Sequence, residues 1–181
     1  MRAPVNIIKK ICLLGDPSVG KTSLIQRYVF DTFSEDYLPT IGTKVVKKTM
    51  VMDFEPQRDQ QVNLTLLIFD LLGQVEFANV HRTYYLGSEG AIFVSDLTRE
   101  ETILSISDWQ RRFHTVVDEV PAILIGNKKD IAQSKQNNKE LLGELAAEKN
   151  LTYLYTSAKT GENVEKAFRM LAVEILNWAP I

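Results

Sequence analysis

The chain has 181 residues, of which 45% are hydrophobic and 24% are charged, and its formal net charge is −2 at pH 7. This length fits one domain with a sizeable core, so we expect residues 1–181 to form a single domain. The balanced charge offers no large binding surface to nucleic acid or to an anionic membrane, so we expect no nucleic-acid partner. Cys12 is the only cysteine, which excludes a disulfide framework and favours a cytoplasmic location.

The ends of the sequence show no membrane signal. Lys9 and Lys10 interrupt the N-terminal apolar stretch, so neither a signal peptide nor a membrane span is predicted there. The final residues NWAPI contain no prenylation cysteine, and the chain does not start with Met-Gly. A soluble protein and a trimmed one both fit these ends. We expect a monomer with no membrane anchor in this chain, so membrane association would need a partner or a missing tail.

Apolar, β-branched runs alternate with helix-period segments along the chain. Strands are predicted at residues 7–14, 43–54, 62–70, 90–96, 121–127 and 151–156. Helices are predicted at residues 22–30, 78–85, 101–117, 138–150 and 164–178.

The connections between these elements predict the topology of the sheet. EPQRDQQ joins the second and third strands and is short enough for a hairpin, so these two strands should be antiparallel. The other connections carry helices, which implies right-handed parallel crossovers. KVVKKTMVM mixes charged and apolar residues, as an edge strand does. The predicted fold is α/β with three layers: a six-stranded, mostly parallel sheet with one antiparallel edge strand, and helices on both faces.

GDPSVGKTS follows the first predicted strand and opens the first predicted helix. Its first eight residues match G-x-x-x-x-G-K-[ST], a spacing that wraps backbone N–H groups around a polyphosphate at a helix N-terminus. Lys21 is expected to reach the terminal phosphates and Thr22 to bind Mg²⁺. The alternative is a strand-to-helix turn that happens to contain glycines. The predicted phosphate contacts are Gly15, Asp16, Pro17, Ser18, Val19, Gly20, Lys21, Thr22 and Ser23.

Two later loops favour guanine as the base. NKKD follows the fifth strand, and the Asp130 carboxylate can accept hydrogen bonds from the guanine N1–H and 2-amino groups, a pair that adenine does not offer. TSAK follows the sixth strand, where a backbone N–H can meet the guanine oxygen. NKKD alone could be a solvated charged loop, but its position beside the other two loops favours base recognition. The predicted base contacts are Asn127, Lys128, Asp130, Ser157, Ala158 and Lys159.

With these loops the sequence resembles a Ras-superfamily small GTPase, closest to the Rab-like branch, over nearly the whole chain. The motifs that carry the resemblance are GDPSVGKT, YLPTIGT, DLLGQ, NKKD and TSAK, with TSAKTGENVEKAF and WQRRF as Rab-like segments. The resemblance implies a P-loop G domain that cycles between GTP and GDP and hydrolyses GTP slowly. It also implies that Phe33 packs against the guanine, that Lys128 and Lys159 flank the base, and that Tyr37 and Thr40 contact the nucleotide.

The resemblance further implies a metal site and a hydrolytic site. Thr22 and Thr40 would bind Mg²⁺, with Asp70 acting through water, which suits an ion that prefers oxygen ligands and keeps several waters. The Thr40 loop would close on the γ-phosphate and relax on hydrolysis, although it could also be a plain loop before an edge strand. Gly73 would meet the γ-phosphate and Gln74 would orient the attacking water. The implied catalytic residues are Gln74, Lys21, Gly73 and Thr40.

The partners implied by the resemblance are an exchange factor, a GTPase-activating protein and effectors, bound through residues 33–54 and 70–85. No arginine lies between Phe33 and Thr43, so we expect a partner to supply the arginine that accelerates hydrolysis.

The sequence departs from the family at three places. Leu71 and Leu72 replace a threonine and an alanine, Pro17 lacks the N–H of the usual small residue, and residues 44–61 form a longer segment. Leu72 and Pro17 bear on the hydrolysis rate and keep open a GTP/GDP-bound interaction module with negligible hydrolysis, whereas Asp130 argues against a P-loop kinase or ATPase. The longer segment could present a partner surface or be a harmless insertion at a loop tip. For Pro17 we expect the ring to face solvent and stiffen the loop.

Overall fold

A computed structural model describes residues 4–34, 43–53, 61–71 and 78–178. The strands are β1 (Val5–Leu14), β2 (Lys44–Asp53), β3 (Gln61–Asp70), β4 (Gly90–Asp96), β5 (Ala122–Asn127) and β6 (Thr152–Tyr155). The helices are α1 (Lys21–Phe30), α2 (Ala78–Tyr85), α3 (Glu100–Leu104), α4 (Ile106–His114), α5 (Gln136–Glu148) and α6 (Val164–Trp178), with a short 3-10 helix, η2 (Lys129–Ile131). None of the helices in these ranges combines the length and apolarity that a membrane crossing requires.

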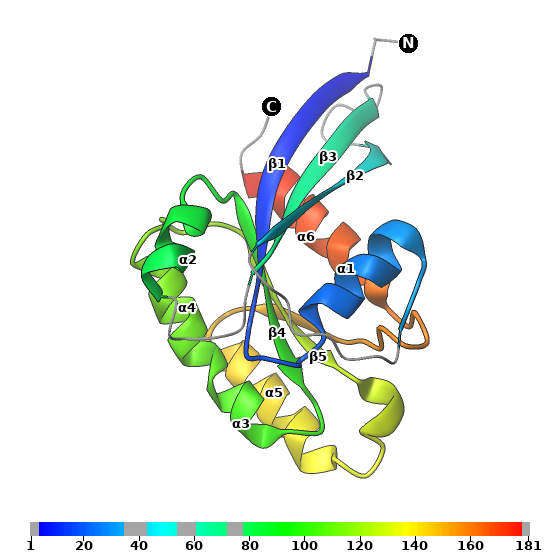
Figure 1. Ribbon diagram of the computed structural model, residues 1–181, viewed down its shortest axis with the longest axis vertical. Coiled ribbons are helices and arrows are strands. Elements are labelled where there is room, and N and C mark those ends of the chain that lie inside the picture. Colours follow the sequence, from blue (N-terminus) through cyan, green and yellow to red (C-terminus); the bar gives the residue numbers. More distant parts are fainter. Residues whose placement is uncertain (1–3, 35–42, 54–60, 72–77, 179–181) are drawn as a thin grey trace.

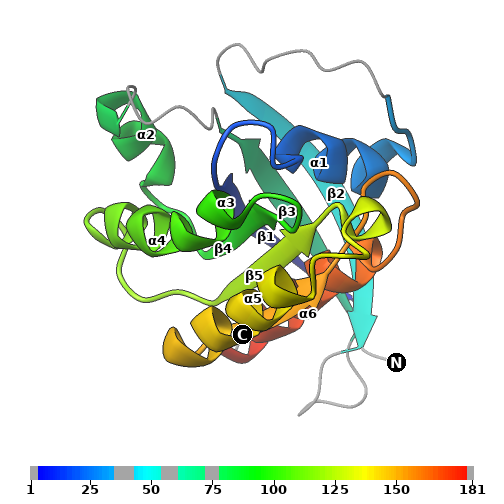
Figure 2. The same ribbon diagram turned by 90° about the horizontal axis from the view of Figure 1, so that it is seen from below.

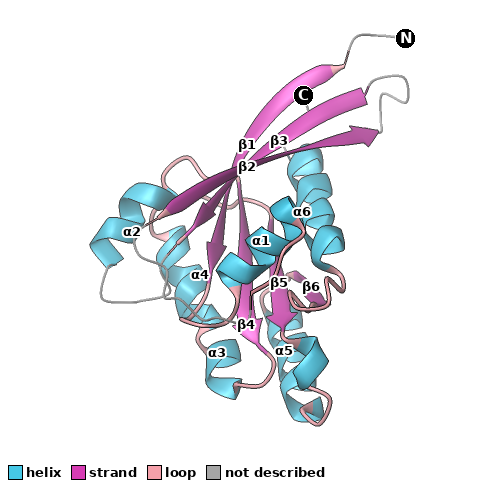
Figure 3. Ribbon diagram, turned by 45° about the vertical axis from the view of Figure 1, so that its right-hand side comes forward, coloured by secondary structure: helices cyan, strands magenta, loops and turns pink. Residues whose placement is uncertain are grey.

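The strands form one six-stranded sheet in the order β2-β3-β1-β4-β5-β6. The pairing of β2 with β3 is antiparallel, from Lys44 opposite Asp70 to Asp53 opposite Gln61. The other four pairings are parallel. The predicted α/β fold with an antiparallel edge strand is therefore confirmed. In Figure 3, β2, β3 and the first half of β1 extend beyond the rest of the sheet.

Helices cover both faces of the sheet, with α1 and α6 on one face and α2 to α5 on the other (Figure 1). Because successive strand side chains point to opposite faces, Ile11 and Leu13 of β1 join the core under α1 and α6. Cys12 and Leu14 join the second core, under α2 to α5. Every residue of β4 and β5 is buried, which explains their nearly continuous apolar sequences.

The structure differs from the prediction in one helix. Residues 101–117 were expected to form a single helix, but α3 and α4 are separated at Ser105. The Ser105 hydroxyl donates to the Thr102 carbonyl at 3.1 Å, and such side-chain bonds compete with regular helical geometry. The remaining predicted elements are present, with ends shifted by one or two residues.

Candidate nucleotide-binding site

The carboxyl ends of the parallel strands bring three loops to one edge of the sheet, onto which Figure 2 looks. Residues 15–20 join β1 to α1, residues 128–131 follow β5, and residues 156–161 follow β6. In open α/β sheets, ligands bind beyond this edge. The three loops that the sequence singled out are thus assembled at the position where a ligand would bind.

The P-loop, residues 15–22, is packed tightly against its neighbours. Gly15 has a φ of +145°, and a Cβ added there would lie 2.1 Å from the carbonyl oxygen of Val94 in β4. Gly20 has a φ of +101°, and its Cβ would lie 2.3 Å from Asn127 Nδ2. Both glycines therefore permit a close approach that a side chain would prevent. Pro17 is exposed, as we expected from the sequence.

Lys21 folds back across the P-loop. Its side chain is buried, and its Nζ donates to the carbonyl oxygens of Gly15 at 2.7 Å and Asp16 at 2.8 Å. Burial lowers the Lys21 pKa to about 8, although Asp70 and Asp16 act in the opposite direction. The structure therefore holds a poorly solvated ammonium group within the loop that is expected to bind phosphate, and an anionic ligand would favour its charged form.

This pKa predicts how binding depends on pH. Nucleotide phosphates should raise the Lys21 pKa above its free value of about 8. The contribution of Lys21 to GDP affinity should therefore be constant below about pH 8 and fall as the pH rises above it, with proton uptake on binding. Calorimetric titrations at about pH 8.5, in buffers of different ionisation enthalpy, measure that uptake.

Lys21→Arg is the control for the uptake, because arginine stays charged throughout this range. We expect that variant to bind GDP with no proton uptake from residue 21. A wild-type protein that takes up no proton at about pH 8.5 would contradict the assignment.

Thr22 and Asp70 form a pair of oxygen donors at the start of α1. Thr22 Oγ1 donates to Asp70 Oδ2 at 2.6 Å. Asp70 is buried, and burial raises its pKa although Thr22, Lys21 and Lys44 act to lower it. Asp70 Oδ1 is buried without a hydrogen-bond partner among the described residues. A hard cation beside this pair would satisfy that oxygen.

Asn127 joins the P-loop to the loop after β6. Its Nδ2 donates to the Val19 carbonyl at 2.9 Å. Its Oδ1 accepts from Thr156 Oγ1 at 3.1 Å and from the Ala158 N–H at 3.2 Å. Because the Asn127 amide is buried and bonded on both ends, it fixes the distance between the phosphate and base loops.

Asp130 is oriented by the loop that follows β6. Ser157 Oγ donates to Asp130 Oδ1 at 2.6 Å, and the Lys129 N–H donates to the Thr156 carbonyl at 3.0 Å. Lys129 also pairs with Glu162. The two base loops are therefore bonded to each other, and the carboxylate is positioned before a base is bound.

Two site residues escaped the sequence analysis because their contacts are distant in sequence. Trp109 of α4 donates its Nε1–H to Asp16 Oδ1 at 2.7 Å. Arg27 of α1 donates Nε to the Ala158 carbonyl at 3.0 Å and Nη2 to the Lys159 carbonyl at 2.7 Å. The WQRRF segment contains Trp109 but does not indicate this contact, and each of the two residues is separated from its partners by 93 or more positions.

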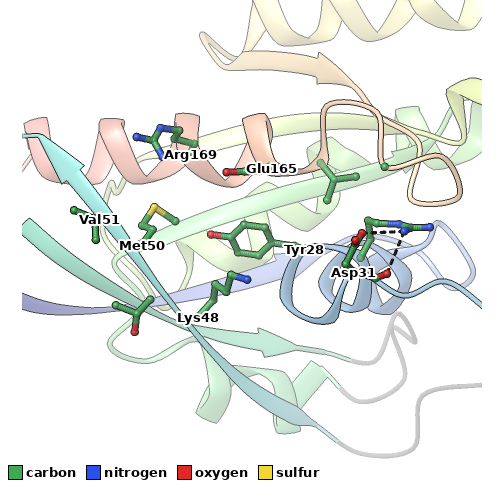
Figure 4. A pocket seen from close by; sticks show the side chains of 11 residues that line it. Tyr28, Asp31, Lys48, Met50, Val51, Glu165 and Arg169 are labelled. Atoms are coloured by element: carbon green, nitrogen blue, oxygen red, sulfur yellow. Dashed lines mark hydrogen bonds and ion pairs between the residues drawn. The ribbon is translucent and has the colours of Figure 1, made fainter.

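A cavity of about 540 Å³ lies between α1, β2 and the start of α6. Tyr28, Met50, Lys48, Glu165 and Arg169 surround it (Figure 4). Gly161 of the loop after β6 and Arg27 also line it, whereas no residue of the P-loop does, so the cavity borders the base side of the nucleotide site.

Several predicted site residues lie outside the described residues. Phe33 is described and packs, half-buried, against the core under α1 and α6. Tyr37, Thr40, Gly73 and Gln74 are not described, nor are Leu72 and the tip of the segment between β2 and β3.

The fold and these loops define a P-loop nucleotide-binding domain. Residues 10–177 match the sequence model of the Ras family. The chain is 34% identical over 178 residues to "Ras-related protein RIC1" of Oryza sativa subsp. japonica, covering 98% of this chain and 85% of that protein. It is 35% identical over 174 residues to "Ras-related protein RABA4a" of Arabidopsis thaliana, covering 96% and 74% respectively. The chain therefore belongs to the Ras family of small GTPases.

As a Ras-family GTPase, the protein binds guanine nucleotide, hydrolyses GTP and acts as a GTP/GDP molecular switch. The Rab-like character of its sequence is confirmed by these relatives. The kinase or ATPase and the interaction module without hydrolysis are thereby set aside.

Proposed function

We propose that the three loops bind one guanine nucleotide with the residue roles expected from the sequence. The P-loop and Lys21 hold the phosphates, and Asp130, Lys128 and the residues 157–159 hold the base. The observation that carries the proposal is that Asn127 bonds directly to both the P-loop and the loop after β6. This linkage keeps the phosphate and base contacts at a fixed spacing, as one ligand spanning both loops requires. Phe33 and Tyr37 complete the nucleotide contacts.

Thr22 and Asp70 fit a Mg²⁺ ion, because both supply oxygen atoms and Asp70 Oδ1 lacks a partner among the described residues. Thr22 and Thr40 would bind the ion and Asp70 would act through water. When bound, Mg²⁺ neutralises charge on the β- and γ-phosphates. The chain's own residues position the ligand: Lys21 places a cation at the terminal phosphates, and α1 directs its N-terminus toward them.

Hydrolysis by this site depends on positioning a water molecule. Gly73 would hold the γ-phosphate through its N–H, and Gln74 would orient the water. We propose that the intrinsic rate is slow, below about 1 s⁻¹, and that a GTPase-activating protein supplies an arginine. We further propose that Pro17 and Leu72 modulate the rate of hydrolysis rather than nucleotide binding.

The protein would act as a single-domain, cytoplasmic monomer, and its family supports three kinds of partner. Exchange factors, GTPase-activating proteins and effectors would bind residues 33–54 and 70–85.

Gln74→Leu tests the proposed hydrolytic role. We expect single-turnover hydrolysis of preloaded GTP to slow by about tenfold or more, because leucine cannot orient water. GDP affinity should be unchanged, since Gln74 is proposed to act on the water. Phosphate release from GTP-loaded protein measures the rate.

Gln136→Leu makes the same substitution on an exposed position of α5, where the Gln136 side chain donates to Glu140 of the same helix. That control should hydrolyse GTP at the wild-type rate. Equal rates for wild type and Gln74→Leu would remove Gln74 from the proposal.

A further inference from the structure

Asp96, the last residue of β4, presents a buried carboxylate beside the nucleotide loops. The residue is 1% exposed. Its Oδ1 accepts from the Thr98 N–H at 2.9 Å and from Thr98 Oγ1 at 2.6 Å. Its Oδ2 lies 2.7 Å from Lys128 Nζ and accepts from Arg99 Nε at 3.2 Å. Burial alone would raise the Asp96 pKa, but the hydrogen bonds from Lys128 and Thr98 lower it overall.

The two cations on Asp96 connect it to different loops. Lys128 belongs to the base loop and has a left-handed φ of +64°, a conformation that is uncommon for a residue other than glycine. Arg99 belongs to the turn between β4 and α3, and its Nη2 donates to the Pro17 carbonyl at 2.8 Å. One buried carboxylate thus holds the side chain of the base loop directly and holds the P-loop through Arg99.

The turn around Asp96 is also fixed independently of these ion pairs. Thr102 Oγ1 accepts from the Asp96 N–H at 2.9 Å, and the Arg99 N–H donates to the Asp96 carbonyl at 2.9 Å. An asparagine at position 96 could keep the Thr98 bonds through its oxygen. The negative charge is therefore not needed to form the turn, and its remaining partners are Lys128 and Arg99.

We propose that Asp96 and Arg99 are positioning residues for nucleotide retention. Asp96 holds the Lys128 side chain where its stem flanks the base, and Arg99 ties the P-loop at Pro17 to the same carboxylate. Loss of the Asp96 charge removes the nearest carboxylate from Lys128 and Arg99, although Arg99 Nη1 also lies 3.9 Å from Glu101 Oε1, and it weakens the hold on both loops. This inference rests on the proposed function, in which Lys128 flanks the base and the P-loop holds the phosphates.

The test is the dissociation rate of N-methylanthraniloyl-GDP, displaced by excess GDP. Asp96→Asn should raise that rate by about tenfold or more, because it removes two charge-assisted contacts. Arg99→Gln should raise it by a smaller factor of about three to ten, since Lys128 keeps its partner. Arg99→Lys should fall between wild type and Arg99→Gln, because lysine can meet Asp96 or the Pro17 carbonyl but not both.

Arg111→Gln is the matched control. Arg111 is exposed on α4 and pairs with Asp108 at 2.6 Å, so this loss of an arginine charge should leave GDP dissociation unchanged. The combined Asp96→Asn, Arg99→Gln variant should release GDP at a rate at most about twice that of Asp96→Asn alone. The two effects should not multiply, because both changes break the same network.

A second nucleotide separates this inference from the proposed function. Inosine diphosphate lacks the 2-amino group that Asp130 is proposed to bind, so wild type and Asp96→Asn should both favour GDP over it by the same factor. Wild type that does not distinguish the two nucleotides would contradict the proposed base site. Asp96→Asn that keeps this preference and releases GDP at the wild-type rate would overturn the inference. The inference would also be overturned if Asp96→Asn lowered the unfolding temperature in saturating GDP but left the GDP dissociation rate unchanged.

Discussion

Asp130→Asn is expected to weaken GDP binding by about a hundredfold to ten-thousandfold and to favour xanthosine diphosphate over GDP. The Asp130 carboxylate can accept from both guanine donors, and each hydrogen bond to a charged group contributes about 1.5–3 kcal/mol. Asparagine offers one acceptor and one donor, and its donor matches the 2-oxo group of xanthine. Ser157 Oγ, at 2.6 Å from Asp130 Oδ1, can still bond to the amide oxygen. Competition of each nucleotide against fluorescent GDP measures the change.

Asp108→Asn is the control for this swap, because Asp108 is exposed on α4 and pairs with Arg111. It should leave the preference for GDP unchanged. An Asp130→Asn variant that still prefers GDP over xanthosine diphosphate would show that the carboxylate does not read the base.

Gly15→Ala is expected to destabilise the nucleotide-stripped protein by more than about 3 kcal/mol, from overpacking and a positive φ together. The added Cβ would lie 2.1 Å from the Val94 carbonyl oxygen, and this atom belongs to the backbone of a central strand that cannot move alone. The P-loop would have to move outward, so GDP binding should weaken as well. Urea unfolding gives the free energy, and GDP titration gives the affinity.

Gly87→Ala separates the steric effect from the backbone conformation. Gly87 also has a positive φ, +73°, but no atom lies within 4 Å of its added Cβ. We expect the free energy of unfolding to fall by about 1–2 kcal/mol, which is the cost of a left-handed backbone conformation alone. GDP affinity should be unchanged. Equal losses at positions 15 and 87 would show that the approach to Val94 is unimportant.

Much of the fold follows from local sequence patterns. The short connection after β2 predicted its antiparallel pairing with β3, and the apolar runs of β4 and β5 predicted strands covered on both faces. Gly15 to Thr22 is a contiguous motif with a known geometry, so its place between β1 and α1 could be read directly. The break at Ser105 could not, because it depends on whether a serine hydroxyl bonds to its own helix.

The residues that hold the nucleotide loops in place are harder to predict than the loop motifs themselves. Asp96, Arg99 and Arg27 lie in ordinary helical or strand-end contexts, and their roles arise when folding brings distant loops together. Arg99 meets Pro17 across 82 positions, and Arg27 meets Ala158 across 131. Composition and periodicity carry no signal for such contacts. Pro17 shows the difference between the two kinds of feature. Its exposed ring was expected from the sequence, but the hydrogen bond from Arg99 to its carbonyl was not.

The central claim is that one guanine nucleotide occupies the three loops. The most direct measurement is chromatographic analysis of nucleotide released by denaturing the freshly purified protein. We predict close to one guanine nucleotide per chain, as GDP or a mixture of GDP and GTP, with no adenine nucleotide. Stoichiometric ATP or ADP, or a protein that is empty and fails to load with GDP in the presence of Mg²⁺, would contradict it.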